Sequence, residues 1–163
     1  MLVQVTAILW RKCYKATIDT LNDRSKGQFH IALPQRNYEE FFVGVPKKDE
    51  TSRGGFTLDV PIEPFSGSEP VGAETLSVRF MGEESGRGDW NIPSQRSATA
   101  YPLWRPNRGA PTEFDSDARE YLVIVRDVQS KFHARWIQDA YFDALPPDIQ
   151  DILNSDNAGW RNI

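Results

Sequence analysis

Apolar and polar residues alternate along several short stretches of the chain, and this period of two is typical of half-buried β-strands. Turn-forming residues such as Asn-Asp and Gly separate the stretches, so each strand is predicted to be short. The most apolar stretch, 119–128, is expected to be the most deeply buried and to form a hairpin with its successor. The strands predicted from the alternation cover residues 14–21, 27–34, 54–62, 74–82, 119–128 and 130–137.

Two other regions follow a helical pattern. Residues 37–45 begin with Asn37, a common helix cap, and Glu39 and Glu40 stand in the first turn, where negative charge suits the helix dipole. Residues 138–157 contain a double proline, an acidic start and apolar positions at helical spacing. We expect one or two short helices there, packed on the edge of the sheet and followed by a frayed end.

Six or seven short strands with few helices predict a mainly β protein, built as a barrel or a sandwich. A length of 163 residues suits one domain with a short appendage, which we place at 1–140 and 141–163. Two polar segments, 22–28 and 82–117, do not fit the sheet. Loops as long as the second are usually functional or disordered, and its tryptophans argue against disorder.

Composition limits the class of protein. Hydrophobic residues make up 39% of the chain, enough for a core, and no apolar run approaches the roughly 20 residues of a membrane span. The opening residues have no basic region ahead of their apolar part, unlike a signal peptide. A single cysteine, Cys13, excludes an internal disulfide and fits a reducing compartment. We therefore expect a cytoplasmic protein without membrane partners.

The net charge of −4 argues weakly against a nucleic-acid partner, but the charge is unevenly distributed. Residues 1–108 contain 14 Lys and Arg against 13 Asp and Glu, whereas residues 109–163 contain 5 against 10. Phosphate groups respond to the local field more than to the total charge. The charge distribution is therefore compatible with two interpretations: the first two thirds of the chain bind DNA, or they form an ordinary soluble surface.

The two polar segments carry the side-chain types that read DNA base edges. Arginine pairs with guanine, asparagine and glutamine match adenine, and a carboxylate accepts from the amino group of cytosine. Two alternatives to DNA contacts remain. Arg87 and Asp89 would pair with each other at the surface, and Trp90 would fold back into the barrel. The candidate residues are Arg24, Ser25, Lys26 and Gln28 in the first segment and Arg87, Asp89, Trp90, Asn91, Gln95 and Arg96 in the second.

Two sets of motifs occur in an order that resembles a known protein family. The first set is a strand ending at Asn22-Asp23, a short polar arm, the strand GQFHIALP and the helix start NYEEFF. The second is a strand ending near Gly82, a basic arm, QRSAT, a Trp-containing loop and the hairpin EYLVIVRDVQSKFHARWI. Over roughly residues 10–137 the chain resembles the N-terminal effector-binding domain of EcoRII-type restriction endonucleases, including the UbaLAI-like branch.

The resemblance implies a B-three-like DNA-binding pseudobarrel whose two arms grip the major groove of double-stranded DNA. It places the N-terminal arm at 22–28 and the C-terminal arm at 84–97. It also implies that the target is CCWGG or a similar sequence and that the protein acts in the prokaryotic cytoplasm. A separate, covalently linked nuclease domain would hold the magnesium and perform catalysis, and this domain would have neither catalytic activity nor a cofactor. Relatives are rich in lysine and glutamate where this chain has Asp89-Trp90 and Pro93, so the individual base assignments do not transfer.

Several other residues have two interpretations. Lys47, Lys48, Arg105 and Arg108 are possible phosphate contacts or ordinary surface residues. The single cysteine and two histidines cannot build a closed zinc site, so Cys13 is expected to be a small buried residue and His30 and His133 structural or surface residues.

Two alternative functions remain at this stage. Asp117, Gln129 and Lys131 resemble a metal-dependent nuclease arrangement, although the middle position lacks the usual carboxylate. The other alternative is a β-barrel that binds a protein or a small ligand through its long loop.

Overall fold

A computed structural model describes residues 4–14, 30–34, 36–66, 69–70, 72–82, 89–93 and 119–163. In this part of the chain, ten strands join in one sheet, accompanied by three short helices. The strands are β1 (Val5–Tyr14), β2 (His30–Leu33), β3 (Lys47–Lys48), β4 (Phe56–Ser66), β5 (Glu69–Pro70), β6 (Glu74–Phe80), β7 (Trp90–Pro93), β8 (Arg119–Asp127), β9 (Phe132–Gln138) and β10 (Ala158–Asn162). The helices are α2 (Tyr38–Phe41), α4 (Asp139–Phe142) and α5 (Pro147–Ser155).

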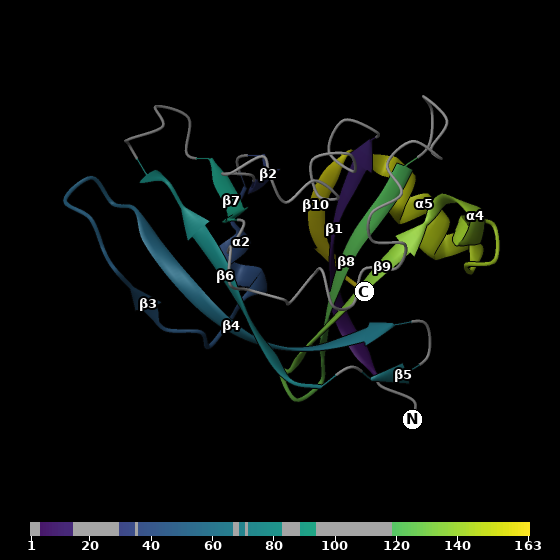
Figure 1. The fold of residues 1–163 in the computed structure, drawn as a ribbon, viewed down its shortest axis with the longest axis horizontal. Coiled ribbons are helices and arrows are strands. Elements are labelled where there is room, and N and C mark those ends of the chain that lie inside the picture. The colour runs from purple at the N-terminus through teal and green to yellow at the C-terminus, as the bar shows by residue number, and fades with distance from the viewer. Residues whose placement is uncertain are drawn as a thin grey trace, which may run out of the picture.

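The sheet runs in the order β10-β1-β8-β9-β4-β6-β7-β2, and β3 and β5 pair with β4. All of these pairings are antiparallel except that of β9 with β4, which is parallel from Ile62↔Phe132 to Phe65↔Arg135. At this junction the sheet bends into two halves, so that β10-β1-β8-β9 and β4-β6-β7 diverge with α2 between them (Figure 1). The nearly closed sheet confirms the prediction of a mainly β pseudobarrel.

The core fills the space between the two halves because apolar residues alternate along the strands. Leu58, Val60 and Ile62 of β4 point inward, as do Ala7 and Leu9 of β1, and all are at most 2% exposed. The aromatic residues of α2 complete this inner core.

A second apolar cluster lies on the outer face of the β1-β8-β9 half. Ile8 and Trp10 of β1 pack there against α4 and α5, which contribute Phe142 and Leu153. Pro147 at the first position of α5 fits the helix start, because its missing N–H would have no partner there. Helices therefore cover this half of the sheet, whereas no described element covers the outer face of the β4-β6-β7 half (Figure 1).

The two ends of the sheet approach each other along a seam, where side chains of β10 contact the segment that follows β2. The indole Nε1 of Trp160 donates to the carbonyl of Asn37 at 3.1 Å, and the Arg36 guanidinium lies 5.7 Å from the Trp160 ring. A Cβ atom at Gly159 would lie 2.9 Å from the Arg36 guanidinium and 3.2 Å from the Trp10 ring. This crowding explains why glycine occupies the strand that closes the seam.

Several predicted elements are confirmed. Strands occur within 27–34, 54–62, 74–82 and 119–128, and β8 and β9 form the predicted hairpin. The tail contains the expected short helices.

The ends of the chain differ from the predictions. The first strand is β1 at Val5–Tyr14, and most of the predicted strand 14–21 lies outside the described residues. The tail finishes in β10, which pairs with β1, so the predicted frayed end is wrong. Because β10 belongs to the same sheet, residues 141–163 pack as part of the barrel.

The helix predicted at 37–45 is shorter than expected, because α2 spans only Tyr38–Phe41. Asn37 makes no side-chain capping hydrogen bond, and its Nδ2 instead lies 3.4 Å from Glu40 Oε1. Asn37 therefore stands at the predicted N-cap position but does not cap the helix with its side chain. Gly44, with φ +84°, ends the turn that follows the helix.

Candidate nucleic-acid interface

The predicted DNA contacts fall only partly within the described residues. The whole N-terminal arm, 22–28, lies outside them, and so do parts of the C-terminal arm. The candidates outside the described ranges are Arg24, Ser25, Lys26, Gln28, Arg87, Gln95, Arg96, Arg105 and Arg108, and those within them are Lys47, Lys48, Asp89, Trp90 and Asn91.

Strands β2 and β7 form a four-rung antiparallel ladder, and the predicted arms join the chain at its two ends. His30, which follows the N-terminal arm, pairs with Pro93, and Leu33 at the other end pairs with Trp90. Strand β7 thus divides the predicted C-terminal arm, 84–97, into two parts that join opposite ends of the ladder. The prediction of one uninterrupted loop is therefore wrong.

Trp90 belongs to the core and does not face a partner. Its side chain is 2% exposed, and its ring lies 4.9 Å from that of Phe80, 5.5 Å from that of Phe56 and 5.8 Å from that of Tyr38, measured between ring centroids. A ring enclosed in this way cannot stack on a sugar or contact a thymine methyl group. The assignment of Trp90 as a DNA contact is therefore wrong, and the alternative in which it folds back into the barrel is confirmed.

Asn91 has the opposite orientation, because successive side chains of a strand point to opposite faces of the sheet. It is half-buried, and its amide forms no hydrogen bond with any described residue. Its neighbour Asp89 is also half-buried, and the Asp89 carbonyl accepts a hydrogen bond from the backbone N–H of Met81 at 2.9 Å. Of the predicted arm residues that the structure describes, Asn91 is the one with an amide available for a partner.

A row of directly opposed residues crosses the outer face of this half of the sheet. Asn91 pairs with Ala32 of β2 on one side and with Arg79 of β6 on the other. Arg79 pairs in turn with Thr57 of β4, and Thr57 pairs with Lys48 of β3. Five strands thus contribute one residue each to this row, which we call the outer row.

Arg79 of the outer row was not among the predicted contacts. It is exposed, and its guanidinium forms no hydrogen bond or ion pair within the described ranges. The alternation of the stretch 74–82 could have identified it, because Arg79 falls on the polar face between buried Val78 and half-buried Phe80. Arg79 precedes the predicted arm, so the motifs of the arm do not include it and the sequence pattern assigns it only to a strand.

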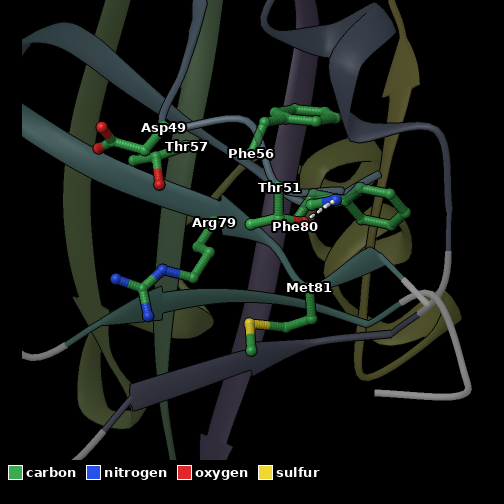
Figure 2. A pocket seen from close by; sticks show the side chains of 8 residues that line it. Asp49, Thr51, Phe56, Thr57, Arg79, Phe80 and Met81 are labelled. Atoms are coloured by element: carbon green, nitrogen blue, oxygen red, sulfur yellow. Dashed lines mark hydrogen bonds between the residues drawn. The ribbon is translucent and has the colours of Figure 1, made fainter. Parts of the chain in front are cut away.

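Arg79 lies beside a hollow of about 250 Å³ between β6 and the loop that joins β3 to β4. Figure 2 shows Arg79 extending from β6 on the same side as Thr57 and Asp49, whereas the ring of Phe80 points the other way. The lining of the hollow therefore includes one guanidinium and one carboxylate.

The predicted phosphate contacts Lys47 and Lys48 already have anionic partners. The Lys47 ammonium lies 3.0 Å from Glu39 and 4.4 Å from the centre of the Phe56 ring. The Lys48 ammonium lies 2.6 Å from Asp59, and this hydrogen bond raises the pKa of Lys48. Both charges are thus partly neutralised, which favours the interpretation of ordinary surface lysines over phosphate contacts.

Two glycines bring the β3–β4 loop against the point where β6 leaves the sheet. A Cβ atom at Gly82 would lie 2.5 Å from the backbone nitrogen of Gly55 and 2.7 Å from the carbonyl oxygen of Arg53. Gly82 also has φ +62°, a conformation that glycine adopts without strain. On the other side of the contact, the Thr51 hydroxyl accepts a hydrogen bond from the Gly55 N–H at 2.9 Å. This contact fixes the root of the first part of the C-terminal arm.

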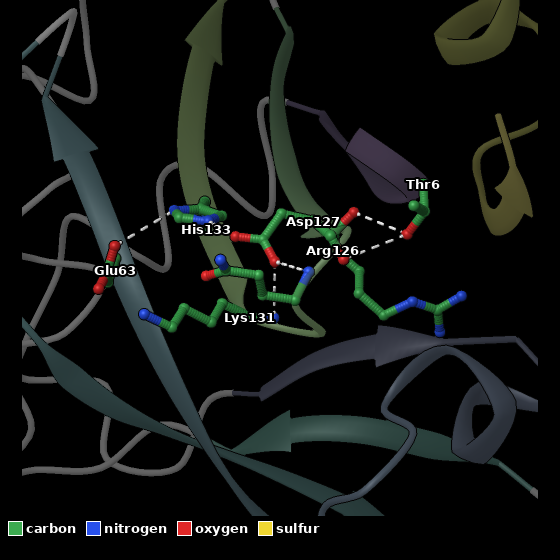
Figure 3. Close-up of polar contacts among 7 residues, drawn as sticks. Thr6, Glu63, Arg126, Asp127, Lys131 and His133 are labelled. Atoms are coloured by element: carbon green, nitrogen blue, oxygen red, sulfur yellow. Dashed lines mark hydrogen bonds and ion pairs between the residues drawn. The ribbon is translucent and has the colours of Figure 1, made fainter. Parts of the chain in front are cut away.

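A buried histidine connects the two halves of the sheet at their parallel junction. His133 Nε2 lies 2.8 Å from Asp127 Oδ2, and Nδ1 lies 3.4 Å from Glu63 Oε2 (Figure 3). His133 and Asp127 are each 7% exposed. Glu63 belongs to β4 and is the register partner of His133 in β9, so this group, the histidine clasp, spans the junction.

Asp127 also shapes the β8–β9 turn. Its Oδ1 accepts hydrogen bonds from the backbone N–H groups of Gln129 at 2.8 Å and Lys131 at 3.0 Å. Burial raises the pKa of Asp127, but the hydrogen bonds from His133 and from these two amides outweigh it, so the pKa lies below its ordinary value. The charged carboxylate is therefore part of the fold.

The structure describes two of the three residues of the nuclease alternative. Gln129 and Lys131 lie in this turn, where the backbone N–H of each is bound to Asp127, and Asp117 lies outside the described residues. His133 is structural, His30 is exposed and Cys13 is buried, as expected. Within the described ranges, no group of three His, Cys, Asp or Glu side chains is arranged to hold a metal ion.

A larger hollow, of about 590 Å³, lies along the seam between β2 and the start of β10. Leu33, Pro34 and Ala158 supply apolar walls, and Arg11 and Asn91 supply polar groups. Its volume and its combination of apolar and polar lining residues are typical of small-molecule binding sites.

Comparisons with known proteins do not assign the chain. No family model matches it, and no curated protein matches it either. No helix within the described ranges combines the length and the apolar character that crossing a membrane requires.

Proposed function

We propose that the protein binds double-stranded DNA sequence-specifically through the major groove, as the effector or target-recognition domain of an EcoRII-type restriction endonuclease in the prokaryotic cytoplasm. A separate nuclease domain would perform magnesium-dependent cleavage, and this domain would contribute binding alone. The expected target is CCWGG or a similar sequence.

One observation carries the proposal. The β2–β7 ladder lies between the roots of the two predicted arms, and its outer face presents an amide without a hydrogen-bond partner among the described residues, that of Asn91. Asparagine matches the donor and acceptor edge of adenine in the major groove. Arms leaving both ends of a short ladder would enter the groove on either side of this face, and their arginines and lysine would contact bases and phosphates.

Binding to a panel of labelled duplexes, one containing CCWGG and the others of unrelated sequence, tests the proposal by fluorescence anisotropy at several salt concentrations. We expect one duplex to bind at least about tenfold more tightly than the others. The affinity should fall steeply with salt, because arginine and lysine release counterions from phosphate. Equal affinity for all sequences, together with an affinity that salt does not change, would contradict the proposal.

A second candidate function is a small-ligand or protein module, and the hollow along the seam favours it. Its mixed apolar and polar lining is typical of small-molecule sites. The same salt series separates the two functions, because a ligand held mainly by apolar walls would not be displaced by salt. Thermal stabilisation of the protein by a small-molecule library, with no response to DNA, would support this second function.

A further inference from the structure

We propose that Arg79 determines specificity by reading a guanine next to the base that Asn91 contacts. The inference rests on the proposed DNA-binding function and assigns a base contact to the sheet itself, in addition to the arms. Arg79 belongs to β6 and precedes both parts of the predicted C-terminal arm.

The relative position of the two side chains supports this assignment. Arg79 and Asn91 are directly opposite each other on antiparallel strands, so both point outward from the same rung. Side chains opposed in this way have Cβ atoms about 5 Å apart. Bases along one DNA strand are stacked about 3.4 Å apart. The pair can therefore address neighbouring base pairs without any change in the sheet.

The chemistry of the two side chains distinguishes bases. The Arg79 guanidinium can donate two parallel hydrogen bonds to O6 and N7 of guanine. The Asn91 amide can accept from N6 of adenine and donate to N7. Neither group has a hydrogen-bond or ion-pair partner among the residues that the structure describes, so neither contact would break an interaction within those residues. An arginine also has the long reach needed to enter the groove while the sheet stays outside it.

The surrounding charges favour a base contact over a phosphate contact for Arg79. Asp49 lines the same hollow as Arg79, and Asp59 neutralises the nearby Lys48. Carboxylates repel phosphate groups, so this face attracts the DNA backbone only weakly. A neutral base edge with two acceptors does not meet this repulsion.

Selection from a duplex library with randomised positions tests the inference, using the wild-type chain, Arg79→Ala and Asn91→Ala. We expect the wild-type consensus to contain adjacent guanine and adenine. Arg79→Ala should lose the guanine preference at that position alone, by roughly tenfold or more, and Asn91→Ala the neighbouring adenine preference. Arg135→Ala, which removes an exposed arginine from β9 in the other half of the sheet, should keep the full consensus.

A second measurement changes the DNA and leaves the wild-type chain intact, so its main comparison does not depend on the folding of a variant. Replacing the guanine of the selected duplex by 7-deazaguanine removes the N7 acceptor and should weaken binding of the wild-type chain roughly tenfold. Arg79→Ala should bind the two duplexes equally.

The outcomes separate this inference from the proposed function. A wild-type consensus that Arg79→Ala leaves unchanged, or a uniform loss of affinity for all sequences, would overturn the assignment of Arg79 while DNA binding stands. The absence of any wild-type consensus would overturn the proposed function itself.

Discussion

Trp90 and Asn91 are consecutive residues of β7 that face opposite sides of the sheet, because side chains alternate along a strand. The same alternation puts Trp90 inward and Asn91 outward, but these two residues were grouped as contacts because they lie in a polar stretch. Polarity alone could not separate them, since the side that a residue faces depends on the strand pairing of β7 with β2 and β6.

Trp90→Ala should destabilise the fold by about 3–5 kcal/mol, because it leaves a large cavity among packed aromatic rings. Denaturant unfolding would measure the change. Tyr141→Ala is the control, since Tyr141 is 62% exposed, and it should change the free energy of unfolding by less than about 0.5 kcal/mol. Equal effects of the two substitutions would show that Trp90 is not a core residue.

Gly82→Ala should destabilise the protein by at least about 2 kcal/mol, because it combines a left-handed backbone with a clash against Gly55. Gly44→Ala is a matched control: Gly44 has φ +84°, but a Cβ atom there meets nothing within 4 Å. Its cost should stay near 1 kcal/mol. If calorimetry finds the two costs to be equal, the contact between Gly55 and Gly82 does not constrain the root of the arm.

At the scale of elements, β1 and β10 are two strands that the sequence pattern did not predict. Strand β1 is buried on both faces in its centre, from Ala7 to Trp10, so it reads as a continuous apolar run without alternation. Strand β10 contains Gly159 and only one large apolar residue, Trp160, which gives no periodic signal. Its place in the sheet depends on pairing with β1, more than 140 residues away in sequence.

The histidine clasp predicts a specific dependence of stability on pH. The pKa of Asp127 is lowered in the folded state, so its contribution to stability is fully present above the unfolded pKa and is lost as pH falls through the folded pKa. Asp127→Asn should therefore lower the free energy of unfolding at neutral pH, and the difference from the wild type should shrink in strong acid.

Chemical unfolding at a series of pH values measures this difference. Asp143→Asn, which changes an exposed carboxylate outside the clasp, serves as the control and should leave the profile unchanged. If Asp127→Asn reduces stability by the same amount at every pH, the carboxylate charge does not act through the clasp.

At the scale of the whole molecule, strand content predicted a barrel-like fold but not which outer face the described helices cover. Helices α4 and α5 cover the outer face of the β1-β8-β9 half, whereas the outer row lies on the other half. The helices cover one half of the sheet because the tail packs there through tertiary contacts, and the local sequence does not indicate which face those contacts involve. This arrangement leaves the β2–β7 ladder and Arg79 on the surface that we propose to face DNA.

The central claim is tested most directly by mapping backbone amide signals in an NMR titration of the protein with its preferred duplex. We expect the largest shifts among the described residues to cluster in β2, β7 and the end of β6 around Arg79, while the signals of α4 and α5 stay unchanged. Shifts confined to α4 and α5, or no shifts with any duplex, would contradict it.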